Sequence, residues 1–147
     1  MAILGKRLLS ALCGLACALC VVVASAEVVV VVSTDSRLET LSRTQLTDIY
    51  LGRLNRLASG EAIVPVDQSD RSPTHEAFYR QYLGQTPAQI RAHWSRLIFT
   101  GRGQPPRTVN DDGAMAELVA ANPNAIGYLD MDHVDDNLRV VRIETHR

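Results

Sequence analysis

The sequence predicts an α/β fold in which a mixed sheet is flanked by helices. Residues 28–32 are five consecutive valines, a run typical of a strand that is covered on both faces. Helical and strand-like segments alternate along the rest of the chain, which indicates at least partly parallel pairing of strands. The length of 147 residues and the lack of an internal repeat or linker fit one domain.

The first 26 residues have the pattern of a secretory signal peptide. A basic start that ends at Lys6-Arg7 precedes an apolar run over residues 8–23 and the small-x-small sequence Ala24-Ser25-Ala26, which signal peptidase reads. We predict cleavage after Ala26, a periplasmic location, and no membrane span in the remaining chain. A retained anchor is one alternative, although the apolar run is shorter than the roughly 20 residues of a spanning helix. Lipidation at Cys17 is another.

The expected mature domain, residues 27–147, has 13 arginines against 16 acidic residues and contains neither lysine nor cysteine. The lack of cysteine excludes disulfides and a thiol nucleophile, so the hydrophobic core must stabilise the domain. We interpret its arginines as scattered singly on a slightly acidic surface. This pattern argues against nucleic acids and anionic membrane surfaces as partners.

The first half of the expected domain carries start and stop signals for two helices. Ser42-Arg43-Thr44-Gln45 is a capping box, which predicts a helix that stops at Gly52. A second strand is predicted over residues 62–66. Ser72-Pro73 then opens another helix, because serine suits the N-cap and proline the first helical position. That helix is expected to run to Gly84.

The second half repeats the same signals. Thr86, Pro87 and Gln89 open a helix that ends at Thr100-Gly101. Four of its apolar residues are expected to face the core: Ile90, Trp94, Leu97 and Ile98. The remaining predicted elements are a surface loop over residues 101–106, a helix that Asp111 or Asp112 caps and Asn122-Pro123 closes, and strands over residues 125–129 and 138–143.

Residues 67–74 are the main candidate for a binding site. They leave a predicted strand and enter a helix, and free amides together with the helix dipole favour an anion at such a turn. Ser72 and Thr74 add hydroxyl donors, and the guanidinium of Arg71 suits an oxyanion. The competing interpretation is purely structural, with Ser72 as a cap and Arg71 paired with Asp70. On spacing alone the structural interpretation is favoured, because a capping serine is common at such turns.

Four segments, in the same order, resemble the phosphate-binding proteins of ABC importers, which belong to the two-lobed solute-binding proteins. Leu46–Gly52 resembles the end of a helix in that family, and Ile63–Val66 resembles the strand that enters its binding turn. Asp70-x-Ser72-x-Thr74 is similar to the R-x-D-G-S-G-T turn that clamps phosphate in the family. Asn122–Tyr128 resembles its PGAIGY segment.

The resemblance implies a single lobe of a periplasmic-binding-protein-like (PBP-like) fold over residues 27–147. It places the ligand-binding residues for a phosphate-like anion in the binding turn: Gln68, Asp70, Arg71, Ser72 and Thr74. The turn departs from the family's pattern, because Gln68 replaces the arginine that contacts phosphate, Arg71 replaces a glycine, and Pro73 replaces a glycine whose amide approaches the ligand. The implied partner is an ABC permease or another periplasmic or membrane protein, and no cofactor is implied.

The chain has about half the length that two lobes need, which limits the functional expectation. Two lobes close around a solute and exclude water, whereas one lobe leaves an anion on an open face where salt screens its charge. The first hypothesis is a binding module for phosphate or another oxyanion, for ABC-type uptake or sensing. The second is a protein-interaction module that keeps the lobe as a scaffold. An enzyme is the third hypothesis and is ranked last, because no set of acid, base and nucleophile is visible in the sequence.

Other clusters are expected to be structural. Residues 130–136 group four carboxylates with an imidazole but lack the spacing of a calcium loop, so a solvated turn is predicted there. The Gly101-Arg102-Gly103 loop is interpreted as a connector, with presentation of Arg102 to an anion or a partner as the alternative. His75 is expected to be exposed, its alternative role being to assist an anion when protonated. His93 and Trp94 are expected to pack against the core.

Overall fold

The computed structural model describes residues 26–145, so the predicted signal peptide lies outside the described residues apart from Ala26. In chain order the elements are β1 (Val28–Ser33), β2 (Thr40–Ser42), α1 (Arg43–Tyr50), β3 (Val64–Gln68), α2 (Pro73–Phe78), η1 (Tyr79–Leu83), α3 (Pro87–Phe99), β4 (Arg107–Val109), α4 (Asp112–Ala120), β5 (Ala125–Asp130), η2 (Met131–His133), β6 (Leu138–Val140) and β7 (Arg142–Glu144).

The main sheet has the strand order β4-β3-β5-β1-β6. β3 runs parallel to β4 and β5, whereas β1 runs antiparallel to β5 and β6, which confirms the predicted mixed sheet. Every residue of β1 is buried, as its run of valines predicts, and the strand lies inside the sheet between β5 and β6. β2 and β7 form a separate parallel pair.

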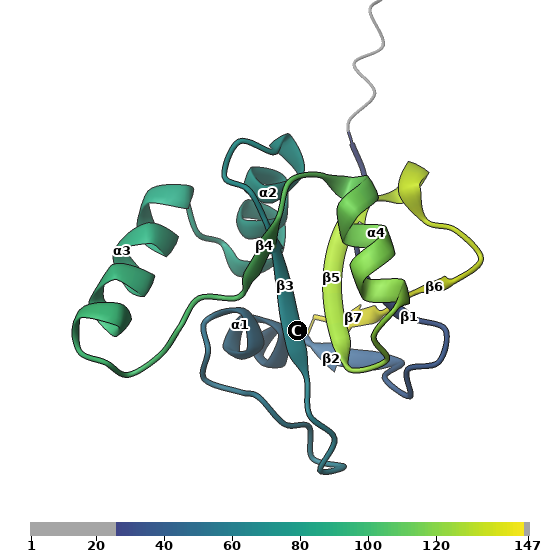
Figure 1. Ribbon diagram of the computed structural model, residues 1–147, viewed down its shortest axis with the longest axis horizontal. Coiled ribbons are helices and arrows are strands. Elements are labelled where there is room, and N and C mark those ends of the chain that lie inside the picture. Colours follow the sequence, from purple (N-terminus) through teal and green to yellow (C-terminus); the bar gives the residue numbers. More distant parts are fainter. Residues whose placement is uncertain (1–25, 146–147) are drawn as a thin grey trace, which may run out of the picture.

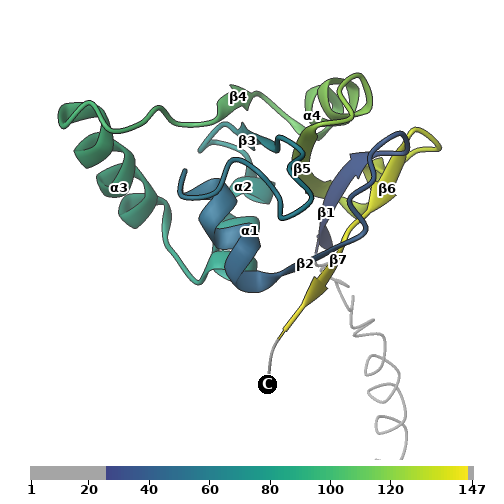
Figure 2. The same ribbon diagram turned by 90° about the horizontal axis from the view of Figure 1, so that it is seen from below.

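Helices cover both faces of the main sheet, as Figures 1 and 2 show. α4 packs so closely on β5 that a Cβ added to Gly127 would lie 2.5 Å from Sδ of Met115. α1 and α2 lie on the other face, where Phe78 stacks on Tyr128 with ring centroids 3.8 Å apart. Neighbouring residues of a strand point to opposite faces, so Gly127 and Tyr128 mark the two layers.

The predicted capping signals are confirmed at α1 and α3. Ser42 and Gln45 exchange reciprocal hydrogen bonds at the start of α1, and Thr86 does the same with Gln89 at the start of α3. Ser72 occupies the N-cap position of α2, but its side chain makes no capping hydrogen bond. Beyond α2 the helix continues as a π-helical turn, η1, which ends in a left-handed Gly84.

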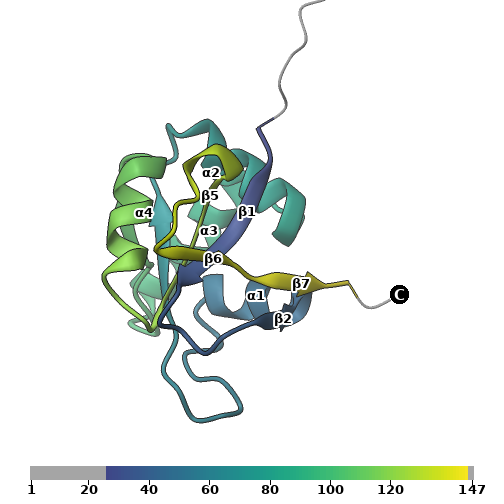
Figure 3. The same cartoon turned by 90° about the vertical axis from the view of Figure 1, so that its right-hand side faces the viewer.

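Several strands differ from the prediction. β3 begins and ends two residues later than the predicted strand over residues 62–66. The predicted strand over residues 138–143 is divided, because the amide of Val141 still donates to Val30 of β1 while the next amide donates to Glu39. The chain therefore leaves the main sheet and continues as β7 beside β2 (Figure 3). β2 and β4 have three residues each and are too short to show a periodic pattern.

α3 projects from the body of the domain (Figures 1 and 2). It is attached through its buried residues Ile90 and Trp94, and the Trp94 ring lies so close to Gly52 that a Cβ added there would be 2.8 Å from Cη2. Leu97 packs partly buried against the core, as predicted, whereas Ile98, also predicted to face the core, is 55% exposed. Among residues 26–145, no helix combines the length and apolar character that a membrane crossing requires.

Candidate functional site

The candidate turn lies at the edge of the sheet where its parallel strands end. β3 ends at Gln68 and β5 at Asp130, and their carboxyl ends meet at one edge because the two strands run in the same direction. α2 begins at this edge after β3, and α4 begins there after β4. Open α/β sheets commonly bind ligands at this edge. The sequence therefore predicts a turn at the place where this fold class binds ligands.

A carboxylate of the protein itself occupies this edge. The side-chain amide of Gln68 donates to Oδ1 of Asp112 at 2.6 Å, and the hydroxyl of Thr74 donates to Oδ2 at 3.1 Å. Nδ1 of His133 lies 3.7 Å from the same Oδ2. Asp112 is in the first turn of α4, where the helix dipole favours negative charge. Two of the predicted anion ligands therefore hold an internal carboxylate.

Gln68 joins the turn to the sheet. Its side chain is buried, its Nε2 also donates to the carbonyl of Tyr128 at 3.1 Å, and its Oε1 accepts the hydroxyl of Ser72 at 2.6 Å. This last bond explains why Ser72 does not cap α2 with its side chain. An amide both donates and accepts, so Gln68 links Asp112 to Ser72 in a way that an arginine, which only donates, cannot.

Asp70 and Arg71 lie on the exposed part of the turn. Oδ2 of Asp70 is 3.8 Å from Nη1 of Arg91 in α3, so Asp70 does not pair with Arg71 as the structural interpretation predicts. In the part of the chain that the structure describes, the Arg71 side chain has no hydrogen bond or ion pair. The structure thus brings Gln68, Ser72 and Thr74 together and leaves the other two predicted residues exposed.

A buried carboxylate, Asp67, lies next to this network. The hydroxyls of Tyr79 and Tyr128 both donate to it, at 2.7 and 2.5 Å. Burial, together with the charge of Asp67, raises the pKa of Tyr79 and of Tyr128, which keeps both hydroxyls protonated. His75 was expected to be exposed, but it is only 5% exposed, because its Nε2 faces this cluster 3.9 Å from Oδ1 of Asp67.

The sequence prediction does not include Asp112 among the binding residues, although one signal was available. Asp111 and Asp112 are adjacent at the start of α4, and only one acid is needed as the cap. The structure assigns the cap to Asp111, whose Oδ1 accepts the amide of Ala114. Asp112 is therefore left to face Gln68. Tyr79 and Tyr128 gave no comparable signal, because they occupy core positions. His133 is the imidazole of the cluster over residues 130–136, whose spacing in the sequence does not indicate its proximity to Asp112.

The other sequence candidates have structural roles. Residues 130–136 form an exposed turn in which carboxylates accept backbone amides. Across residues 26–145, no group of three or more His, Cys, Asp or Glu side chains is arranged to hold a metal ion. His93 contacts the carbonyl of Leu51 at 3.0 Å and Trp94 is buried, as predicted. A surface hollow of about 290 Å³ lies at the opposite edge of the sheet and does not include the candidate turn.

Solved structures with a similar fold include several phosphate-binding proteins. An ABC-type phosphate transport receptor from Vibrio cholerae shares 20% identity with a TM-score of 0.62, and the match covers 82% of this chain and 47% of that one. A phosphate ABC transporter-type substrate-binding protein from Clostridium perfringens, solved with bound phosphate, shares 25% identity with a TM-score of 0.62, covering 79% and 44%. PstS from Borrelia burgdorferi shares 13% identity with a TM-score of 0.60, covering 82% and 48%.

The chain spans less than half the length of each of these structures. Among curated proteins, none matches the chain. The model of the PBP superfamily domain matches residues 10–143, well over half of the sequence. The fold matches one lobe of the solved proteins, which confirms the predicted fold class and the resemblance. The chain therefore belongs to the family of PBP superfamily domains.

Proposed function

We propose that this protein is an exported, periplasmic, non-enzymatic solute-binding domain whose ligand is a phosphate-like oxyanion, for ABC-type uptake or sensing. The observation that carries the proposal is the convergence of the Gln68 amide and the Thr74 hydroxyl on the two oxygens of one carboxylate. A phosphate also presents adjacent oxygen acceptors, so donors placed for one group suit the other. A structural relative that was solved with bound phosphate supports the choice of ligand.

In this proposal Asp112 is an internal occupant that the incoming oxyanion displaces. Each hydrogen bond to its carboxylate is worth about 1.5–3 kcal/mol, and its charge repels an anion that approaches without displacing it. Arg71, which is exposed on the turn, supplies a cation for the incoming ligand. The expected result is weak binding, with a Kd of about 1 mM, that salt weakens further because salt screens the charge of the exposed Arg71.

Calorimetric titration with phosphate at low salt tests the proposal, with wild type compared to Asp112→Ala. Asp111 remains as the cap of α4, so the variant keeps its fold. In this variant phosphate no longer has to break the hydrogen bonds to Asp112. The Kd for phosphate should therefore fall about tenfold or more, which corresponds to the free energy of one hydrogen bond to a charged group. Asp35→Ala is the matched control, because it removes one exposed carboxylate at the opposite edge of the sheet and should leave binding unchanged. Arg71→Ala should weaken binding.

The proposal fails if neither wild type nor Asp112→Ala gives heat up to about 10 mM phosphate, well above the expected Kd. Equal binding by wild type and Asp112→Ala would contradict displacement of the internal carboxylate. Binding by Asp112→Ala alone would show that the occupant blocks the site in the natural protein, which favours a different role for the domain.

That different role is a protein-interaction module that keeps the lobe as a scaffold. It is favoured by the internal occupation of the turn, where Gln68 and Thr74 already donate to Asp112. The partner in this case is an ABC permease or another periplasmic or membrane protein. Cross-linking in intact cells distinguishes the two functions, because contact with a scaffold persists in Thr74→Val and without phosphate.

A further inference from the structure

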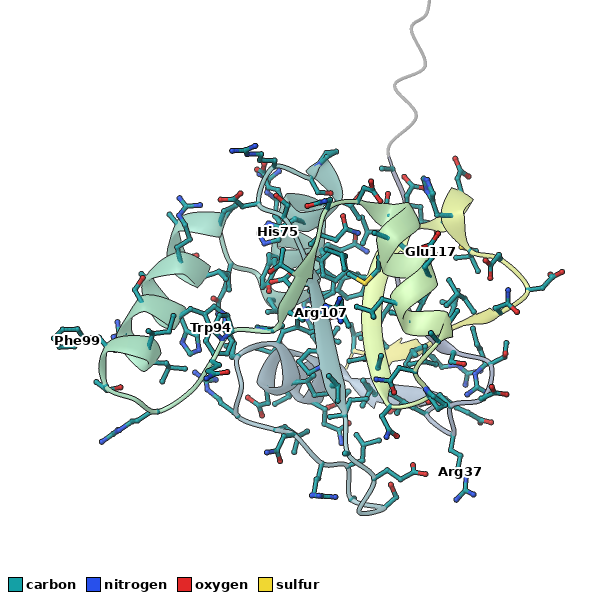
Figure 4. All side chains as sticks on the ribbon, viewed as in Figure 1. Arg37, His75, Trp94, Phe99, Arg107 and Glu117 are labelled. Carbon is teal, nitrogen blue, oxygen red and sulfur yellow. The ribbon has the colours of Figure 1, made fainter. Side chains whose placement is uncertain are left out.

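We propose that the free end of α3 is a docking surface for an anionic lipid bilayer. Ile98 and Phe99 end this helix and are 55% and 92% exposed. Figure 4 shows Phe99 pointing away from the body, whereas Trp94 lies on the side of α3 that faces the body. The two neighbouring side chains make an apolar tip on the part of the molecule that projects furthest in Figure 1.

The segment around this tip is positively charged. Residues 77–110 contain five arginines and no acidic residue, so all 16 acidic residues of the chain lie elsewhere. The five arginines are exposed: Arg80, Arg91, Arg96, Arg102 and Arg107. Arg80 pairs with Glu76 and Arg91 with Asp70, whereas the other three have no ion pair among residues 26–145. The interpretation of the arginines as scattered singly therefore does not hold for this segment.

Unpaired arginines flank the apolar tip along the chain. Arg96 precedes Phe99 by three residues, a spacing that puts both on one side of a helix. Arg102 follows in the loop that the left-handed Gly101 begins. Apolar side chains bordered by cations are the combination that binds a membrane interface, because the apolar groups enter the acyl boundary while guanidinium groups contact lipid phosphates.

The small size of the tip favours a bilayer over a protein partner. A specific protein interface buries about 800 Å² of each partner, and two apolar side chains at the end of a projecting helix offer far less matched surface. Lipids adapt to a convex tip and need no complementary shape. An anionic surface also attracts this basic end and repels the acidic remainder of the domain, so charge alone orients the protein with α3 toward the bilayer.

Co-sedimentation with vesicles tests the proposal. The full chain is expressed so that the host cell can remove the predicted signal peptide. Wild type and all variants are then compared in the same cleaved form. The protein should bind vesicles made of an equal mixture of phosphatidylglycerol and phosphatidylcholine. Binding should be weaker at higher salt, and weaker on vesicles of pure phosphatidylcholine. Phe99→Ser should lower the partition coefficient about tenfold or more, and Arg102→Gln about fivefold. Met131→Ser, which changes a residue that is 44% exposed and lies outside the basic segment, is the matched control and should bind like wild type.

Phe99→Ser alters a side chain in solvent, so the variant keeps its fold, which circular dichroism verifies. The proposal is overturned if wild type does not bind the anionic vesicles, or if wild type and Phe99→Ser bind them equally. It is also overturned if Phe99→Ser abolishes a concentration-dependent self-association while vesicles remain unbound, since the tip would then contact protein. Asp112→Ala should not affect vesicle binding, so this test stands apart from that of the anion site.

Discussion

Replacing Tyr128 with phenylalanine should destabilise the protein by about 2 kcal/mol. The hydroxyl of Tyr128 donates to the buried Asp67 and accepts the amide of Gln68 at 3.1 Å. A hydrogen bond to a charged group is worth about 1.5–3 kcal/mol. The stack of the Tyr128 ring on Phe78 is kept in the variant, so little packing is lost. For a domain of this size, such a loss lowers the Tm by roughly 8 °C, which thermal unfolding followed by circular dichroism measures.

Tyr50→Phe is the matched control, because Tyr50 is equally buried but its hydroxyl donates to the neutral carbonyls of Val66 and Ile126. Its removal should cost about 1 kcal/mol. The reasoning is refuted if Tyr128→Phe costs no more than Tyr50→Phe. It is also refuted if Tyr128→Phe costs as much in an Asp67→Asn background as in wild type, because the coupling to the carboxylate would then be absent.

Three further predictions concern other parts of the molecule. The free energy of unfolding in urea should fall steeply above about pH 10, because burial raises the pKa of three tyrosines around Asp67, namely Tyr50, Tyr79 and Tyr128. Their stabilisation is complete below the pKa of an unfolded tyrosine and is lost as the pH rises past it, by about 1.4 kcal/mol per pH unit for each tyrosine. Gly127→Ala should cost about 1–3 kcal/mol in urea unfolding, because its Cβ would meet Met115 at 2.5 Å, whereas Gly113→Ala, with its nearest atom at 3.5 Å, should cost nothing. Thr86→Ala should cost about 1 kcal/mol in the same assay through loss of the α3 cap, and an unchanged midpoint would contradict that role.

Local signals account for the elements that the sequence predicted well. Capping residues fix the starts of α1 and α3, and the valines of β1 identify a strand that must be buried on both faces. The features that the sequence predicted wrongly depend on contacts between residues far apart in the chain. Ile98 has the spacing of a core residue, but it lies on the exposed side of the last turn of α3, whereas its neighbour Leu97 packs against the core. The division of β6 from β7 depends on Val30 and Glu39, which lie about a hundred residues earlier in the chain.

The sequence predicted where the candidate site lies, but not which side chain of the protein contacts it. A strand that enters a helix through a turn rich in hydroxyls identified the edge of the sheet, and Gln68, Ser72 and Thr74 do meet there. The contact with Asp112 was not predictable, because Asp112 is 44 residues from Gln68 and reaches it through the parallel pairing of β3 with β4. An acid at the start of a helix looks the same in a sequence whether it faces solvent or accepts hydrogen bonds from a distant turn.

The position of β1 in the sheet has a consequence for how the chain reaches its fold. β1 is the first strand of the described chain, yet its partners follow about a hundred residues later, with Val28 opposite Asp130 and Val31 opposite Val140. Pairing over such a separation is slow, since closing so long a loop costs chain entropy before the new contacts repay it. Until β5 and β6 arrive, five consecutive valines present an apolar strand with two unpaired edges, which is prone to aggregate. A chaperone that covers this strand during folding is therefore expected to raise the yield of folded protein.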